Sequence, residues 1–361
     1  MKTLDRVAYV LNYVFAIALV LSYISPYVRP GDLWFISLFG LLYPVWLAIN
    51  IIFIIYWAFR LKNRFFLSIL VIAAGYFHFN KFFQFQEQPE YPPVESIRFY
   101  SHNLKAFGLN GPEFQTEDGE KIFRYLDQHL FDVYCFQEFF DTDRKDFSPY
   151  DSIKKVTHAK YRHVEYLPEF RGNKFGLATL SQYPIVEKGM VEFEREGTNM
   201  CIYTDIDFDG TVVRVYNMHL QSVHLKPDDY EFLRNPQNSE SPTEETKGLI
   251  SRLVKAYEKR EEQTYTIEEH MEQCPYPIIV CGDFNDTPLS HAYEMIRAGG
   301  NLKDAFQENG SGLGSTYNGM LPILRIDYMF YSPQIENHYF EIVHEDLSDH
   351  YPLIGYFSLP E

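Results

Sequence analysis

Long apolar stretches with almost no charge occupy the first quarter of the chain. Two of them contain no charged side chain at all. A third, shorter stretch covers residues 65–79, and it extends to residue 83 only if it takes in the charged Lys81. A helix that crosses a bilayer needs about 20 mostly apolar residues. The pattern predicts a membrane region at residues 1–86 with three transmembrane helices, at residues 7–25, 33–59 and 65–83.

A cleaved signal peptide is the alternative interpretation of the first apolar stretch. No cleavage site of small residues follows that stretch, and a second long apolar stretch comes directly after it. A signal peptide has such a cleavage site and lacks a second apolar segment of this kind. We therefore expect the first helix to be retained in the membrane.

The loops between the apolar stretches predict their orientation. Arg60, Lys62 and Arg64 form the only dense basic cluster between two predicted spans, and basic loops stay on the cytoplasmic side of a membrane. The N-terminus is then cytoplasmic, and the third helix places the following residues outside the cytoplasm, in the periplasm of a Gram-negative cell. If residues 65–79 lie in the interface instead of crossing, the rest of the chain is cytoplasmic.

After a proline-rich linker at residues 87–94, the pattern changes to short apolar or alternating runs, which are typical of strands. Eight strands are predicted, at residues 97–100, 133–136, 175–180, 202–208, 212–220, 278–281, 326–330 and 354–357. Helical periodicity lies between several of them, at residues 118–129, from 241 onward, and at 289–298. Strands with interspersed helices predict an α/β (α+β) domain over residues 95–361, in which helices cover sheets.

The segment before the longest predicted helix shows two different patterns. Residues 226–240 are polar without periodicity and are predicted as a surface loop. Ser241, Pro242 and Glu244 then form a typical helix start, with an N-cap, a proline in the first turn and a glutamate that completes a capping box.

Composition supports a large folded domain. Hydrophobic residues make up 46% of the chain and aromatic residues 17%, which excludes a disordered chain. The four cysteines form no C-x-x-C pair and no Cys/His pattern of zinc type. Cys135 and Cys281 stand in apolar runs, where we expect buried thiols.

Charge is distributed unevenly over the chain. Residues 1–86 contain seven Lys or Arg and two acidic residues, whereas the rest contains 25 basic and 47 acidic residues. A generic duplex-DNA binder is expected to be basic or to carry a basic stripe, because phosphate neutralisation drives its affinity. The acidic balance disfavours that class, although a local basic patch on an acidic domain stays open.

Polar side chains follow the predicted strands near the points where the strands end. They are Asn103, Glu138, Asn217, His219, Asp283, Asn285, Asp327, Asp349 and His350. A polar turn would explain the stretch "CGDFNDTPLSH" by itself, because Asp and Asn favour turns. Carboxylates clustered beside a buried strand are costly unless a cation lies between them, and functional sites often lie on loops at strand ends.

Six motifs, in this order, resemble those of the endonuclease/exonuclease/phosphatase superfamily, which has the DNase-I-like fold. They are "SHNLKA", "FQE", "NMHLQ", "GDFND", "RIDYMF" and "SDHYP", and "FGLATLSQYPI" resembles the strand before the third motif. The resemblance covers about residues 95–359 and does not include the apolar leader. It implies a four-layer sandwich of two packed β-sheets flanked by helices, and metal-dependent hydrolysis of phosphoester bonds.

The resemblance also implies a metal site. Glu138 is expected as the principal ligand, with Asn103 and with Asp327 or Asp349 as further ligands. The expected metal is Mg²⁺, for which Mn²⁺ is a substitute; Mg²⁺ prefers oxygen ligands and keeps several waters. One metal and two metals are both compatible with the motifs.

Water is the expected nucleophile. Asp283, with Asn285 beside it, is placed to orient or deprotonate that water, and His350 is expected to pair with Asp349, which would fix its tautomer. Either Asp283 or His350 is the base. His219 is expected to donate to a non-bridging phosphate oxygen. Further substrate contacts are expected from Asn173, Lys174 and Asn217.

Together these features predict a membrane-anchored, Mg²⁺-dependent phosphoester hydrolase with no obligate protein partner. Anchoring and the acidic surface favour the headgroup of a phospholipid or sphingolipid as substrate. An extracytoplasmic nuclease acting on DNA or RNA is the alternative, because one fold serves many substrates. A catalytically silent binding module is the third interpretation, and it is disfavoured because every expected catalytic position holds a reactive residue.

Overall fold

The fold comes from a computed structural model, which describes residues 3–87, 95–108, 117–143, 148–168, 172–193, 199–235, 237 and 241–360. All of the predicted linker except residue 87 lies outside these described residues. The chain divides into two compact units. The first comprises residues 1–80, 221–264 and 286–294, and the second comprises residues 81–220, 265–285 and 295–361.

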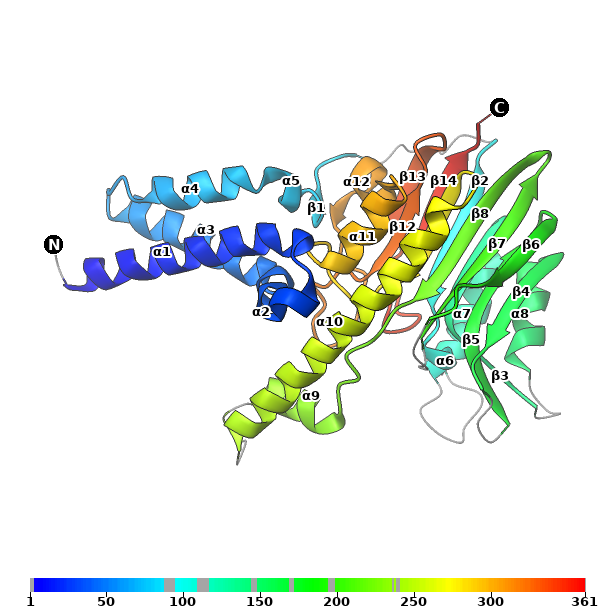
Figure 1. The fold of residues 1–361 in the computed structure, drawn as a ribbon, viewed down its shortest axis with the longest axis horizontal. Coiled ribbons are helices and arrows are strands. Elements are labelled where there is room, and N and C mark those ends of the chain that lie inside the picture. The colour runs from blue at the N-terminus through cyan, green and yellow to red at the C-terminus, as the bar shows by residue number, and fades with distance from the viewer. Residues whose placement is uncertain are drawn as a thin grey trace. The chain divides into compact units, whose positions relative to one another are not determined.

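Two six-stranded mixed sheets build the second unit (Figure 1). One sheet runs in the order β13 (Glu336–Ile342), β14 (Leu353–Ser358), β2 (Ile97–Asn103), β3 (Val133–Thr142), β5 (Asn173–Ser181) and β4 (Tyr161–Tyr166). The other runs in the order β10 (Lys303–Asp304), β12 (Asp327–Tyr331), β9 (Ile278–Asp283), β8 (Thr211–His219), β7 (Met200–Phe208) and β6 (Ile185–Met190).

Each sheet has one parallel pair near its centre, β2 with β3 and β8 with β9. The carboxyl ends of a parallel pair lie at the same edge of the sheet. In each sheet, the polar residues near the carboxyl ends of the parallel pair therefore lie at the same end of the strands.

All eight predicted strands are present, most of them longer than predicted. Of the strands longer than two residues, the sequence patterns missed β4, β6 and β13. Each of these is an outermost strand of its sheet. Edge strands are solvated on several sides, and β6 is mostly exposed, so the apolar alternation that identifies a strand is weak there.

The packed faces of the two sheets form one hydrophobic core. It includes Phe99 and Cys135 from one sheet and Val215, Cys281 and Met329 from the other. The predicted burial of the Cys135 and Cys281 thiols is confirmed. Sheets that pack face to face in this way interdigitate side chains from both inner faces.

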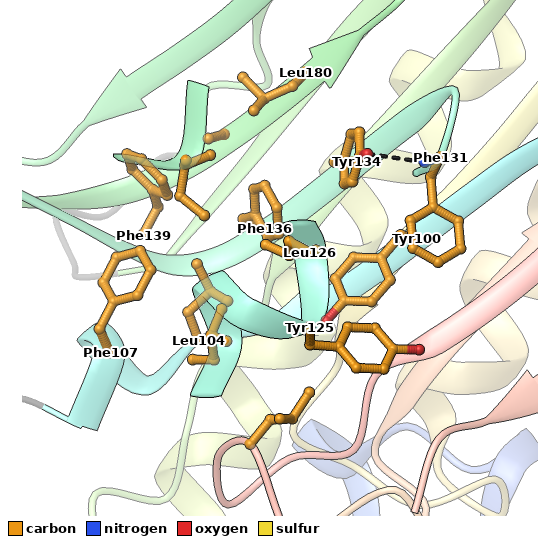
Figure 2. Close-up of a cluster of buried hydrophobic side chains, with 14 of the residues drawn as sticks. Tyr100, Leu104, Phe107, Tyr125, Leu126, Phe131, Tyr134, Phe136, Phe139 and Leu180 are labelled. Atoms are coloured by element: carbon orange, nitrogen blue, oxygen red, sulfur yellow. Dashed lines mark hydrogen bonds between the residues drawn. The ribbon is translucent and has the colours of Figure 1, made fainter. Parts of the chain in front are cut away.

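A second core lies between the β2–β3–β5 sheet and its covering helices, α7 (Glu117–Gln128) and α8 (Pro149–Thr157). Figure 2 shows its aromatic side chains, which include Tyr100, Phe136 and Phe139. Helix α8 begins at an N-cap, where Ser148 Oγ accepts from Asp151 N at 3.1 Å. In this part of the predicted α+β sandwich, a layer of helices therefore covers the β2–β3–β5 sheet.

Helices also flank the other sheet. The C-terminal part of α10 (Pro242–Glu272) lies on β7 and β8, where His270 Nδ1 is 2.8 Å from Tyr216 Oη and the His270 ring lies 4.7 Å from the Tyr203 ring, tilted by 39°. Helix α12 (Ala305–Asn309) buries Phe306 against the inter-sheet core. Two mixed sheets flanked by helices confirm the predicted fold class.

The first unit contains the apolar helices α1 (Thr3–Ile24), α2 (Pro30–Leu41), α3 (Tyr43–Phe59), α4 (Phe65–Ala74) and α5 (Tyr76–Phe79). Among the described residues, one apolar helical segment, Thr3–Tyr27, is long enough to cross a membrane by itself. Helices α2 and α3 reach that length only as a pair, bent by 51°.

The boundaries of the second and third predicted spans differ from the observed helices. The second span divides near Leu42, because Pro44 in the first turn of α3 has no N–H for a continuous helix. The third divides at Gly75, and its predicted end at Phe83 lies instead in β1 (Phe83–Gln84), which pairs with β11 (Gly312–Leu313).

Buried polar side chains connect the apolar helices. Asn12 Nδ2 donates to Ser68 Oγ at 2.7 Å, Ser68 Oγ donates to Asn50 Oδ1 at 2.9 Å, and Trp57 Nε1 donates to Asn12 Oδ1 at 3.0 Å. All four residues are fully buried. The network fixes α1, α3 and α4 against one another, since buried polar groups without partners are costly.

The predicted surface loop at residues 226–240 contains a helix, α9 (Pro227–Arg234). The Asp229 side chain caps the N-terminus of this helix: the backbone N–H of Lys226, directly before the helix, donates to Asp229 Oδ2 at 2.7 Å. The loop prediction was therefore wrong for this part. A single proline and two acidic residues were a helix-start signal that the absence of apolar periodicity concealed.

Candidate active site

The polar ends of β2, β3, β8 and β9 converge on one cluster. Asn103 Nδ2 donates to Asp283 Oδ2 at 3.0 Å and lies 3.4 Å from Glu138 Oε1. Asn103 and Glu138 come from one sheet and Asp283 from the other, so the cluster joins the two sheets at their carboxyl ends. Asp283 is almost fully buried, whereas the Glu138 side chain is 39% exposed.

Backbone conformation places Asp283. Gly282 has a φ of +150°, and a Cβ at this position would lie 2.0 Å from Met218 O on the neighbouring strand. Only glycine allows this approach of β9 to β8. Asn285, with a φ of +54°, then turns back so that its N–H donates to Asp283 Oδ1 at 2.7 Å and its Nδ2 donates to Leu220 O at 3.0 Å.

Glu138 lies at an irregularity in β3. The register between β3 and β5 shifts between Phe136 and Phe139, and Glu138 has a left-handed φ of +46°. A bulge of this kind turns a side chain out of the regular alternation of the strand. A non-glycine residue in this region is strained, and such residues cluster at functional sites.

His350 is oriented by Asp327, not by Asp349. His350 Nδ1 lies 2.9 Å from Asp327 Oδ2, while Lys105 Nζ forms an ion pair with Asp349 Oδ2 at 2.7 Å. The expected His350–Asp349 pair was therefore wrong. Asp349 lies in a bend directly before His350, and the two side chains face different groups. In this arrangement Asp327 is a partner of His350, and its carboxylate also belongs to a group of possible metal ligands with Asp283 and His350.

Two histidines flank the buried Asp283 carboxylate. His219 Nε2 lies 3.7 Å from Asp283 Oδ2 and 3.8 Å from Glu138 Oε1, and His350 Nε2 lies 3.8 Å from Asp283 Oδ2. These separations are longer than a direct hydrogen bond. Both Nε2 atoms therefore keep hydrogen-bonding capacity for the oxygens of a bound substrate.

The charges of the cluster act on one another. Burial raises the pKa of Asp283 to about 6, and the nearby Asp327 carboxylate adds to this rise. Burial alone lowers the pKa of His350, but the Asp327 and Asp283 carboxylates outweigh it and raise that pKa to about 10. These groups therefore titrate together and not as independent sites.

Three expected substrate-binding residues lie elsewhere. Asn217 is fully buried between the sheets, where it accepts from Gln137 Nε2 at 2.7 Å and donates to Ala178 O at 3.0 Å. Asn173 pairs with Thr142 in the β3–β5 ladder, and Lys174 Nζ binds Asp143 Oδ1 at 2.5 Å. That end of the ladder is four residues beyond Glu138, about 13 Å along the strand.

Residues that the sequence patterns did not single out support the cluster from behind. His102 Nε2 is 3.1 Å from both Ser348 Oγ and His350 O, and Ser348 Oγ lies 2.8 Å from Asn103 O. Burial lowers the pKa of His102 to about 3, so this side chain is a neutral packing element. Both residues stand inside the motifs "SHN" and "SDH", and that position was the only signal for them.

The donor atoms of the cluster suit a hard divalent cation. Glu138, Asp283 and Asp327 supply carboxylate oxygens close together, and Asp283, Asp327 and His350 each offer a ligand atom within 4.8 Å of the others. Asn103 differs from its expected place, because its Oδ1 accepts from Lys105 N at 3.0 Å while its Nδ2 faces the carboxylates. Oxygen-rich sets of this kind bind Mg²⁺ or related ions.

The fold and this cluster define a class of protein: a two-sheet hydrolase whose site is suited to a divalent cation and an anionic substrate. The chain belongs to the endonuclease/exonuclease/phosphatase family, whose family model matches residues 101–350. It is therefore a metal-dependent hydrolase that acts on phosphoester bonds. A second family model, a domain of unknown function (DUF8431), matches residues 5–82.

Solved structures show the same fold at low sequence identity. An endonuclease/exonuclease/phosphatase family protein from Leptotrichia buccalis matches with a TM-score of 0.52 and 18% identity, over 72% of this chain and 98% of that chain. A mannosyl-6-phosphatase from Bacteroides thetaiotaomicron matches with a TM-score of 0.51 and 18% identity, over 73% and 100%. A humanized TDP2 of D. rerio matches with a TM-score of 0.51 and 15% identity, over 73% of this chain and 99% of that chain. No curated protein matches the chain.

Proposed function

We propose that this chain is a membrane-anchored, Mg²⁺-dependent phosphodiesterase that releases the headgroup of a phospholipid or sphingolipid. The observation that carries the hydrolytic part is the convergence of Glu138, His219, Asp283 and His350 on one cluster. These residues provide a metal ligand, a phosphate donor and two candidate bases around a common point.

Each side chain has a proposed task. Glu138, with Asp283 nearby, holds the cation, and a bound Mg²⁺ neutralises the phosphate and stabilises the leaving oxygen. His219 Nε2 donates to a non-bridging phosphate oxygen. The attacking water gives its proton to Asp283; His350, whose ring is held by Asp327 at Nδ1, accepts that proton only at a pH above its raised pKa of about 10.

The first unit supports the proposed anchor. Helices α4 and α5 follow α1 over most of its length, since Arg64 donates to Asp5 O near one end and His78 stacks on Tyr23 near the other. Many α1 side chains are exposed and apolar, including Val10, Val14 and Ile17. Exposed apolar faces of this kind suit a lipid environment, and three crossings would place the catalytic unit outside the cytoplasm.

The choice of a lipid over a nucleic acid rests on charge and anchoring. The residues after 86 contain 25 basic and 47 acidic side chains. Such a balance weakens attraction to a polyanion, whose binding depends on many phosphate contacts. A lipid headgroup presents one phosphate at a surface to which the enzyme is already held.

A substrate panel tests this proposal. The full-length chain in detergent micelles is assayed with Mg²⁺ on vesicles of phosphatidylcholine and sphingomyelin, on single-stranded and duplex DNA, and on RNA. We expect metal-dependent headgroup release with the nucleic acids intact. Cleavage of nucleic acid alone would replace the lipid hydrolase with the tethered nuclease.

A further inference from the structure

Helix α10 carries a buried arginine into the interior of the first unit. Arg260 is 1% exposed. Its Nε donates to Asp286 Oδ2 at 2.9 Å, its Nη1 donates to Gln221 O at 2.7 Å, and its guanidinium lies 4.8 Å from the centre of the Tyr257 ring. A planar guanidinium donates in two fixed directions at once, which a lysine does not.

The two partners of Arg260 directly continue the two segments that carry catalytic residues. Gln221 comes two residues after His219 in the chain, and Asp286 comes directly after Asn285. In the second unit these segments are already joined, because Asn285 Nδ2 donates to Leu220 O at 3.0 Å and Leu220 N donates to Asp283 O at 2.9 Å. Arg260 joins the same two segments one residue further along each.

A second residue of α10 completes the contact. Gln263 lies three residues after Arg260, on the same side of the helix, and its Oε1 accepts from Gln221 N at 2.9 Å. Both backbone polar groups of Gln221 are therefore held by α10, the N–H by Gln263 and the carbonyl by Arg260. A backbone held at both groups has little freedom to move.

We propose that Arg260 and Gln263 are positioning residues for phosphoester hydrolysis: they fix the distance between the segment that follows His219 at the end of β8 and the segment that follows Asp283 at the end of β9. This inference rests on the proposed function for its catalytic consequence. The two residues touch neither substrate nor metal and act through the backbone of Gln221 and the carboxylate of Asp286. A displacement of about 1 Å in such a site costs about 100-fold in rate.

The test compares two buried ion pairs in the full-length chain. Arg260→Met and the milder Arg260→Lys remove or weaken the clamp. Arg214→Met is the matched control, because Arg214 also forms a buried ion pair, with Asp205 at 2.6 Å and 2.7 Å, near the start of β8. Hydrolysis of bis(p-nitrophenyl) phosphate with Mg²⁺ gives kcat and KM, and thermal unfolding gives the folded fraction.

We expect both Met variants to unfold at lower temperature, and only the Arg260 variants to lose kcat per folded molecule, by about 100-fold for Met, with KM nearly unchanged. A purely structural role would lower stability in both and kcat in neither. Equal loss of kcat in Arg214→Met, or normal kcat in both folded Arg260 variants, overturns the proposal.

Hydrogen exchange separates this inference from the proposed function. The amides of Leu220, Gln221 and Asn285 all donate within or beside the clamp. We expect them to exchange at least about tenfold faster in Arg260→Lys than in the wild type and in Arg214→Met, since local opening releases their hydrogen bonds. If the wild type fails to hydrolyse the probe, the proposed function fails, and unchanged exchange in Arg260→Lys overturns the clamp by itself.

Discussion

Individual residues at the site hold conformations that most side chains avoid. Glu138 and Asn285 both have left-handed φ values, and so do Lys105, Ala106 and Phe107, which begin two residues after Asn103. Each such non-glycine residue costs roughly 1–2 kcal/mol. Five of the ten described non-glycine residues with positive φ lie just after β2, in the bulge of β3 or just after β9, near the cluster.

The glutamate at the bulge of β3 is the first residue to test. We expect Glu138→Gln to lower the hydrolysis rate by at least about 100-fold, because the neutral amide removes the most accessible carboxylate of the proposed metal site, while the unfolding temperature stays within a few degrees. The control is Glu187→Gln on β6, where the side chain is 61% exposed. Near-normal activity of Glu138→Gln at saturating Mg²⁺ would remove Glu138 from the site.

The glycine before Asp283 gives a stability prediction. Gly282→Ala should destabilise the protein by a few kcal/mol, because the new Cβ would meet the Met218 carbonyl at 2.0 Å and φ is positive there. Gly210→Ala is the matched control, since it also has a positive φ but no atom within 4 Å of the added Cβ. Thermal unfolding in detergent measures both, and an equal small effect would contradict the close-approach argument.

The motifs located the candidate residues but not their partners. Six ordered motifs singled out Glu138, Asp283 and His350, which the structure brings together. The partner of His350 was mispredicted, because sequence adjacency favours Asp349 while strand geometry favours Asp327 on another segment. Asn217 was predicted to contact the substrate and lies instead in the core between the sheets. Strand alternation assigns Asn217 to one face of β8, but it does not tell whether that face packs against the other sheet.

At the scale of elements, the two sheets are joined by polar contacts as well as by the core. His163 on β4 is fully buried, with Nδ1 2.8 Å from Thr204 Oγ1 on β7 and Nε2 3.2 Å from Glu165 Oε1. Burial lowers the pKa of His163, and Glu165 opposes that effect only in part. The neutral form of this histidine is therefore the one that fits between the sheets.

This contact makes stability depend on pH. Because the pKa of His163 is lower in the folded state than its ordinary value near 6.5, the folded state binds fewer protons than the unfolded state below pH 6.5, and stability falls as the pH falls through that window. We expect His163→Gln to reduce the loss of stability between pH 7.5 and pH 5, measured by unfolding at the two pH values. His338→Gln on β13 is the control, and an unchanged pH dependence in His163→Gln would refute the assignment.

Element boundaries followed the sequence where burial was strong and failed where it was weak. The central strands β2, β8 and β9 were predicted from apolar runs that are mostly buried. The edge strands β4 and β6 carry exposed polar residues and gave no alternation. The predicted apolar stretches are helical over most of their length, but the helix breaks at Leu42 and Gly75 depend on a proline and a glycine inside continuous apolar stretches, where hydropathy alone gives no signal.

At the scale of the whole molecule, the chain combines an apolar helical leader with an acidic hydrolase domain. Asp5 and Arg60 form an ion pair at 2.9 Å, which lies at the end of the helices that carries the basic loop. Basic loops mark the cytoplasmic side, and three crossings from there lead out of the cytoplasm. If only two segments cross and the third lies in the membrane interface, the catalytic unit is on the cytoplasmic side instead.

A fusion reporter decides between these topologies. Alkaline phosphatase joined after Glu361 should be active, and a fluorescent protein that folds only in the cytoplasm should stay dark, because we expect an extracytoplasmic C-terminus. Fusions within the basic loop at Lys62 should give the opposite pair of signals. A fluorescent C-terminal fusion would show that the third apolar segment does not cross.

The most direct measurement is the metal dependence of phosphodiester hydrolysis by the full-length protein. The rate on bis(p-nitrophenyl) phosphate is followed with Mg²⁺, after EDTA, and after Mg²⁺ is restored, for the wild type and for Asp283→Asn. We predict hydrolysis that stops with EDTA, returns with Mg²⁺, and is lost by about 100-fold or more in Asp283→Asn. A rate that EDTA leaves unchanged, or that Asp283→Asn retains in full, would contradict a metal-dependent hydrolase built on this cluster.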